Sequence, residues 1–159
     1  MNRADLTPHG AVHLTVLGPD GKRTAERSGT NTVVGGGRSL LAQLLTGAAT
    51  HPQFKATIGI EGAPTLPDLT KLLQPDGIQP QPVTEVQAKD GTISLKATFP
   101  AADKDRQIAE TGLMLACTID ANLSETLYNR ALVQPALPLR SGEVLTLTWT
   151  LSFTAPGAS

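Results

Sequence analysis

Several stretches of the chain alternate between apolar and polar residues, a period of two that is typical of β-strands with one buried face. In residues 11–17 the apolar face consists of Val12, Leu14 and Val16. The clearest stretch is residues 143–153, in which threonine and serine occupy the opposite face. Its apolar face consists of Leu145, Leu147, Trp149, Leu151 and Phe153.

Turn residues separate these stretches and predict hairpins. A Gly-Pro-Asp-Gly turn at residues 18–21 leads into a polar strand at residues 22–27, which has little to bury and is expected at a sheet edge. Asp90-Gly91 favours a type I′ turn. Further strands are expected at residues 54–60, 83–89, 92–99, 108–119 and 126–133.

One short helix is predicted at about residues 38–46, after a run of glycines at residues 35–37 that we expect to be a flexible turn. Its apolar stripe is Leu40, Leu41, Leu44 and Leu45, and Gly47 suits the position after its last turn. A helical turn is expected at residues 69–73, and the proline-rich residues 74–82 are expected to be irregular.

These patterns predict a mainly β fold, an antiparallel β-sandwich of about seven or eight strands with one short helix. We expect a single domain at residues 9–154, a flexible N-terminal arm at residues 1–8 and a flexible tail at residues 155–159. The 159 residues suit one domain, and a hydrophobic fraction of 40% is enough for a core.

Charge and cysteine content exclude several classes of protein. The formal net charge of −1 argues against a nucleic-acid clamp, which needs an excess of basic residues. A single cysteine, Cys117, excludes an internal disulfide framework and a cysteine-based zinc cluster. No apolar run is long enough to cross a membrane, and residues 1–10 lack the apolar segment of a signal peptide.

The sequence presents no candidate catalytic, cofactor-binding or metal-binding residue. Cys117 lies within a predicted strand and is interpreted as a buried, inert thiol. The glycine run lacks the Gly-Lys-Ser/Thr ending of a phosphate-binding loop, and His9 and His13 would lie too far apart on a strand for one metal ion. Asp103-Lys104-Asp105 is interpreted as a solvated hairpin tip. We therefore expect no enzyme and no cofactor.

Five phrases between about residues 30 and 154 resemble, in their order, a family of small β-sandwich tail, baseplate and fibre proteins of bacteriophages and phage-derived contractile injection particles. The chain departs from the family at residues 58–62: Ile60 follows Gly59, and Glu61-Gly62 stands where the family has a second small residue. The phrases are Asn-Thr-Val-Val at 31–34 with the leucine-rich helix, Ile-Gly-Ile-Glu-Gly at 58–62, Ile-Ala-Glu-Thr-Gly-Leu at 108–113, Leu-Tyr-Asn-Arg-Ala at 127–131, and the strand at 145–153.

The resemblance implies a non-enzymatic structural protein of a virion tail, made in the bacterial cytoplasm without a signal peptide. Its partners would be other tail or baseplate subunits and further copies of itself, with no role for nucleic acid or membrane. The candidate docking surfaces are residues 1–8, 22–27 and 74–82. The alternative for each of them is an ordinary solvated loop. No receptor-binding residue is carried over from the family.

Glu110 and Arg130 lie among apolar neighbours on two strands that we expect to pair. Their placement predicts a bidentate ion pair, half buried at the sheet margin, that fixes the register of the strands. The alternative is two separately exposed charges.

Two other functions compete with tail assembly. A stand-alone module that binds a cell-surface glycan or receptor would need exposed aromatic residues, so burial of Trp149 and Tyr128 would argue against it. A hydrolase or transferase would need titratable groups that converge in a pocket.

Overall fold

A computed structural model of the chain describes residues 9–63, 68–69, 71–72 and 76–152. The expected arm at residues 1–8 and the tail at residues 155–159 lie outside these residues. The elements, in chain order, are β1 (His9–Leu17), β2 (Arg23–Val33), α1 (Gly35–Thr46), β3 (Ala49–Gly59), β4 (Gln81–Pro82), β5 (Glu85–Lys89), β6 (Thr92–Thr98), β7 (Arg106–Ile119), β8 (Asn122–Leu139) and β9 (Val144–Ser152).

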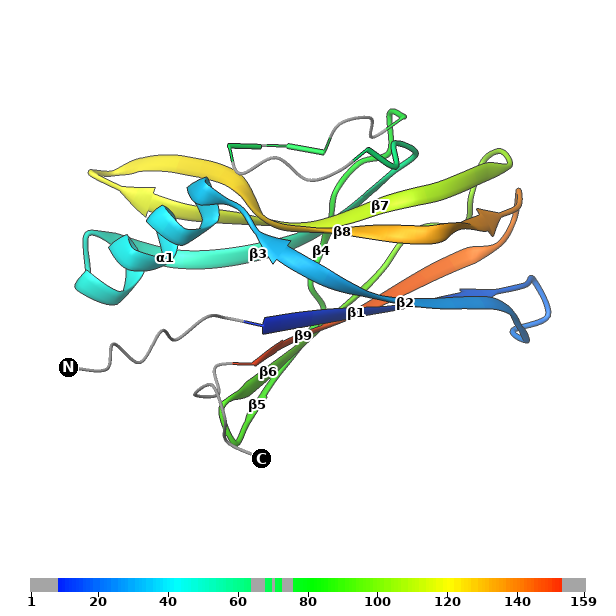
Figure 1. The fold of residues 1–159 in the computed structure, drawn as a ribbon, viewed down its shortest axis with the longest axis horizontal. Coiled ribbons are helices and arrows are strands. Elements are labelled where there is room, and N and C mark those ends of the chain that lie inside the picture. Colours follow the sequence, from blue (N-terminus) through cyan, green and yellow to red (C-terminus); the bar gives the residue numbers. More distant parts are fainter. Residues whose placement is uncertain (1–8, 64–67, 70, 73–75, 153–159) are drawn as a thin grey trace.

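The nine strands form one antiparallel sheet in the order β4-β3-β7-β8-β2-β1-β9-β6-β5. The sheet curls at β2, which pairs with β1 through Arg23–Thr30 and with β8 through Asn31–Val33. Figure 1 shows the layer of β3, β7 and β8 above the layer of β1, β9, β6 and β5. The prediction of a mainly β, antiparallel fold with one short helix is confirmed. The ninth strand is the two-residue β4.

The core fills the space between the two layers, and the alternating pattern places it correctly. Every second residue of β9 is buried, from Leu145 to Leu151, and β1 buries Val12, Leu14 and Val16. The facing layer contributes residues such as Leu113 and Leu115 to the same cluster. Burying such aliphatic side chains stabilises a fold by roughly 1.5–3 kcal/mol each.

The turn predicted at Asp90-Gly91 is confirmed. Both residues have positive φ, 50° and 74°, as a type I′ turn requires. The turn at Asp120-Ala121 has the same form, with φ of 48° and 64°. It joins β7 and β8, which are both longer than predicted.

The polar strand expected at an edge is the first part of β2. Residues 23–27 lie in the ladder with β1, and the ladder between β2 and β8 includes only residues 31–33, so residues 23–27 are paired on one side, as an edge requires. The side chains of β2 alternate between exposed and partly buried positions, and Ala25 is the apolar residue among the partly buried ones that packs against the core. The sequence pattern did not show that β2 continues into a second pairing with β8.

Helix α1 begins at Gly35, so the glycines form its first turn and not a flexible linker. Gly37 lies against β8, where a Cβ atom would be 2.4 Å from the carbonyl oxygen of Tyr128. Leu40 is buried, but Leu45 is 81% exposed and does not belong to the packed stripe. Successive residues turn by about 100° around a helix, so Leu45 lies roughly 140° from Leu40 and beyond the contact face.

The residues between β3 and β5 are described only in part. Of the helical turn expected at residues 69–73, residues 70 and 73 lie outside the described residues, and Leu69, Lys71 and Leu72 are not helical. Leu72 is buried and packs with Val34 and Leu127 in a small second cluster.

Candidate functional site

The structure brings Glu110 and Arg130 together on adjacent strands. Glu110 of β7 is opposite Leu132 of β8, and Gly112 is opposite Arg130, so the two charged residues are diagonal neighbours on one face. Nε of Arg130 donates to Oε2 of Glu110 at 2.7 Å. Neither side chain has any exposed surface, so the expected half-buried position at the sheet margin is wrong.

The segment after β3 accounts for this complete burial. Nη1 of Arg130 donates to the carbonyl oxygen of Ala63 at 2.6 Å, and Nη2 donates to that of Glu61 at 3.1 Å. A side chain added at Gly112, between the two charges, would meet Leu72 at 3.1 Å. The pair therefore fastens residues 61–63 over the outer face of β7 and β8.

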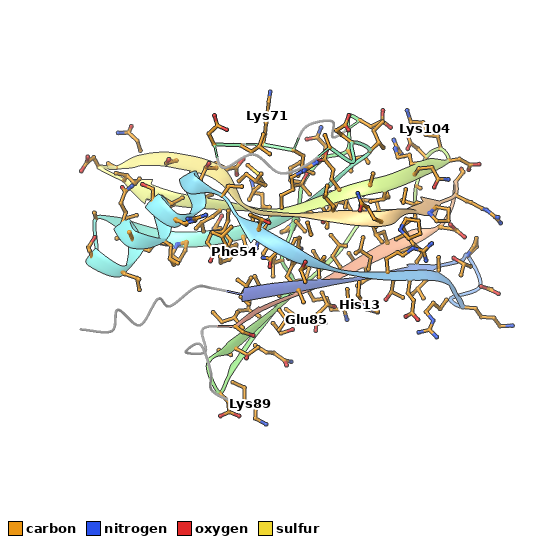
Figure 2. All side chains as sticks on the ribbon, in the orientation of Figure 1. His13, Phe54, Lys71, Glu85, Lys89 and Lys104 are labelled. Atoms are coloured by element: carbon orange, nitrogen blue, oxygen red, sulfur yellow. The ribbon has the colours of Figure 1, made fainter. Side chains whose placement is uncertain are left out.

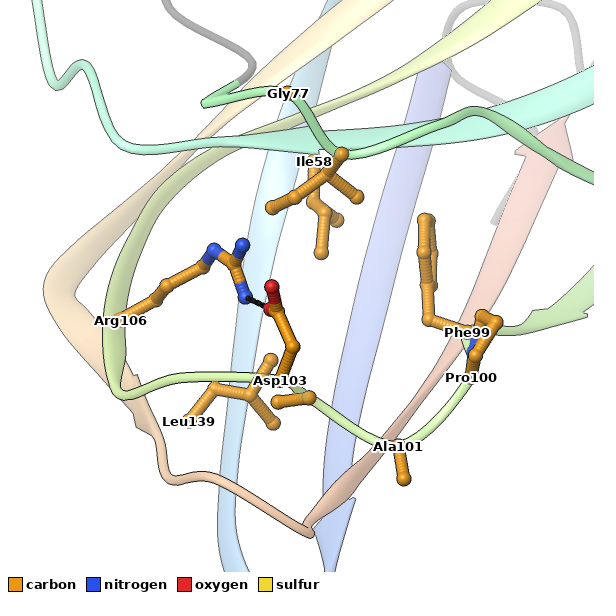
Figure 3. Close-up of a pocket in the computed structure, with 10 residues that line it drawn as sticks. Ile58, Gly77, Phe99, Pro100, Ala101, Asp103, Arg106 and Leu139 are labelled. Atoms are coloured by element: carbon orange, nitrogen blue, oxygen red, sulfur yellow. Dashed lines mark hydrogen bonds and ion pairs between the residues drawn. The ribbon is translucent and has the colours of Figure 1, made fainter.

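A second charged cluster lies around Arg106, which is largely buried (Figure 3). Its Nη1 donates to Oδ1 of Asp103 at 2.5 Å and its Nε to Oδ2 of Asp76 at 3.0 Å. Lys104 contacts the same Asp76 carboxylate at 3.3 Å. These hydrogen bonds from Arg106 hold the pKa of both carboxyl groups below its usual value.

The recess beside Arg106 has a volume of about 230 Å³, and aliphatic and aromatic side chains including Ile58, Phe99 and Leu139 line it. Asp103 and Lys104 were expected at a solvated hairpin tip, but they lie on the connection between β6 and β7, which belong to different layers. Asp105 of this connection accepts a hydrogen bond from the main chain of Ser141 at 2.8 Å. The cluster thus ties together loops at one end of the sandwich.

A third group of charged side chains lies on the exposed surface of β1 and β2, where His13 and Arg23 contact Glu26 at 3.5 and 2.9 Å. Within the described part of the chain, no group of three or more His, Cys, Asp and Glu side chains is placed to hold a metal ion. His13 and His51 are exposed, and the side chain of His9 lies outside the described residues. Cys117 is buried, and burial raises the pKa of its thiol.

The described aromatic residues lie in the core or pack against it, and Phe153, expected on the apolar face of the last strand, lies outside the described residues. Trp149 is 0% exposed and Tyr128 is 1% exposed, while Phe54 packs edge-on against Tyr128 at a ring separation of 5.7 Å. Among the described residues, only Phe54 is a partly exposed aromatic residue. The aromatic surface that a sugar-binding module would need is not formed by these residues.

A groove lies at the side where β3 and β4 of one layer approach β5 and β6 of the other. It has a volume of about 520 Å³. Val86 on β5 is 65% exposed there, a large apolar side chain with little cover. The groove is mainly apolar, with Phe54, Pro82, Val83, Val86, Ile93 and Leu95 in its lining.

This groove was not predicted from the sequence. The pattern Glu-Val-Gln-Ala-Lys at residues 85–89 predicts a strand, but it does not show that the strand ends the sheet. Of the expected docking surfaces, residues 22–27 lie mostly within the first part of β2, which pairs with β1 alone, and the proline-rich segment reaches the groove through Pro82. The arm at residues 1–8 lies outside the described residues.

Comparison with models of protein families, with curated proteins and with solved structures finds no match to this chain. In the described part of the chain, no helix has the length and apolar character needed to span a membrane. The function is therefore argued from the surfaces and packing of the chain itself.

Proposed function

We propose that this protein is a non-enzymatic structural component of a phage or phage-like tail, such as a baseplate, tail-tip or fibre-attachment protein. It works by binding other tail subunits and further copies of itself within the virion. The ordered phrases between residues 30 and 154 support the choice of this class of particle.

The observation that carries the proposal is the apolar groove beside β5. An apolar surface that is open to water is costly for a monomer and useful for a protein that works by contact. Val86 lies in this groove, is 65% exposed and belongs to the edge strand β5. An edge strand offers unpaired main-chain groups to a partner.

The attachment of two loops to the sheets favours the same function. Arg130 fastens residues 61–63, and Arg106 fastens the connection between β6 and β7 through Asp103. Both arginines are used in holding the scaffold, and a rigid scaffold lowers the entropy cost of assembly. Binding of a cell-surface glycan is the weaker alternative, because Trp149 and Tyr128 are buried.

The test is co-expression with the proteins encoded by the flanking open reading frames, followed by light scattering of the purified mixtures. We expect a complex of defined mass with at least one of these proteins, and we expect Val86→Asp to weaken it. Leu123→Asp is the matched control, because Leu123 is also an exposed strand residue, at 77%, and does not line the groove.

Failure of the wild-type chain to bind any flanking protein, together with its absence from purified particles, would overturn the proposal. Equal loss of binding in Val86→Asp and Leu123→Asp would show that the groove is not the attachment surface.

A further inference from the structure

Strand β5 forms one edge of the sheet, and all five of its residues are exposed. The opposite edge is β4, which has two residues and contains Pro82. A short strand with a proline resists the addition of another strand, whereas β5 has neither protection. In the described part of the chain, the outer side of β5 has no neighbour.

The β5–β6 hairpin fixes which main-chain groups of β5 point outward. Lys89 is opposite Thr92 across the two-residue turn, and Gln87 is opposite Ser94. In a two-residue hairpin the residues that flank the turn form a hydrogen-bonded pair, and such pairs recur at every second position. The main-chain N–H and C=O groups of Val86 and Ala88 therefore point away from β6.

We propose that two copies of this chain associate by antiparallel pairing of their β5 strands about a two-fold axis at Gln87. In this register Glu85 lies opposite the partner's Lys89, and Val86 lies opposite the partner's Ala88. The main-chain groups of Val86 and Ala88 are those that point outward, so these two residues make the hydrogen bonds of the new ladder.

Charge complementarity selects this register over its neighbours. Lys96 of β6 already contacts Glu85 at 3.4 Å, so the dimer places Glu85 between Lys96 and the partner's Lys89. Both partners of the new pair are exposed, and Figure 2 shows Lys89 at the far end of the β5–β6 hairpin. An axis one residue away, at Val86 or at Ala88, would place Gln87 opposite the partner's Glu85 or Lys89 and form no such ion pair. An axis at Glu85 or at Lys89 would place like charges opposite each other, which destabilises a strand pair.

The dimer also covers apolar surface. Val86 faces the groove, as do Ile93 and Leu95 on the neighbouring strand. Pairing brings the partner's Ala88 beside Val86 on this face, so two partly open apolar edges shield one another. The inference rests on the proposed function only in treating β5 as an attachment surface, and it names the second copy as the occupant.

The experiment uses the purified full chain in sedimentation velocity at several protein concentrations. We expect a monomer–dimer equilibrium whose larger species has twice the mass of the 16.6 kDa chain. Glu85→Lys alone and Lys89→Glu alone should each weaken the dimer about tenfold or more, because each places like charges opposite each other at two symmetric positions.

Mixing the two single variants in equal amounts supplies the decisive control. In the mixed dimer every charge of one strand again lies opposite its complement, so dimerisation should return to the level of the wild type. The double variant Glu85→Lys with Lys89→Glu should also dimerise. Circular dichroism of each variant verifies that the sheet is intact.

A chain that stays monomeric at all concentrations, or a dimer that neither single variant weakens, would overturn the inference. A monomer that still binds a flanking tail protein would overturn the inference and leave the proposed function standing. A dimer that responds to the charge variants but is absent from tail particles would support the inference and overturn the proposed function.

Discussion

The buried ion pair makes a sharp prediction for the substitution Arg130→Met. The side chain of Arg130 donates to Glu110 and to the carbonyl oxygens of Glu61 and Ala63. Methionine fills a similar volume but cannot donate any of these hydrogen bonds. The carboxylate of Glu110, which has no exposed surface, then loses this charged partner.

Removal of one partner of a buried pair costs about 3–5 kcal/mol. A domain of this size is stable by about 5–15 kcal/mol, so the variant should lose about a fifth of its stability or more. Since 1 kcal/mol shifts the melting temperature by roughly 2–4 °C in a chain of this length, the expected decrease is roughly 6–20 °C. The double variant Glu110→Leu with Arg130→Met removes both charges of the pair and should be more stable than Arg130→Met alone.

Urea denaturation followed by tryptophan fluorescence measures these differences, because Trp149 is the single tryptophan and is fully buried. Amide exchange at Glu61–Ala63 gives a local measurement and should accelerate in Arg130→Met. Arg130→Lys keeps the charge but loses the planar set of donors, so it should fall between the wild type and Arg130→Met. Unchanged denaturation midpoints in both single variants would refute the reasoning.

Three further predictions concern other parts of the fold. Gly37→Ala should lower the free energy of unfolding by about 1–3 kcal/mol, measured by thermal unfolding, because the new Cβ would lie 2.4 Å from the carbonyl oxygen of Tyr128. As a control, an alanine at an exposed position of the same helix should have little effect. The Cys117 thiol is buried and its pKa is raised, so it should resist a thiol reagent at pH 8 in the folded protein and react fully in denaturant. Rapid reaction of the folded protein would contradict this burial. Arg106 lowers the pKa of Asp103, so this pair stabilises the fold above about pH 4 and loses its effect as the pH falls through the lowered pKa. The difference in unfolding free energy between wild type and Arg106→Gln should therefore shrink below pH 4. A difference that stays constant with pH would disprove the link.

The sequence predicted those features that depend on neighbouring residues in the chain. The alternation in β9 follows from a strand with one buried face, and it placed Trp149 in the core. Asp90-Gly91 predicted its turn because both residues accept positive φ. Glu110 and Arg130 were found from their apolar neighbours, since a charge within a buried strand needs a charged partner.

Features that depend on distant parts of the chain required the tertiary structure. The sequence alone determined the period of the strands and the turn at Asp90-Gly91, because these follow from local geometry, and it named Glu110 and Arg130 as candidates for an ion pair. Only the folded chain decided that β2 passes from β1 to β8, that residues 61–63 cover Arg130 and that β5 ends the sheet. Pairing and covering involve residues tens of positions apart, and a local pattern of apolar and polar residues carries no record of which strand becomes the neighbour of another.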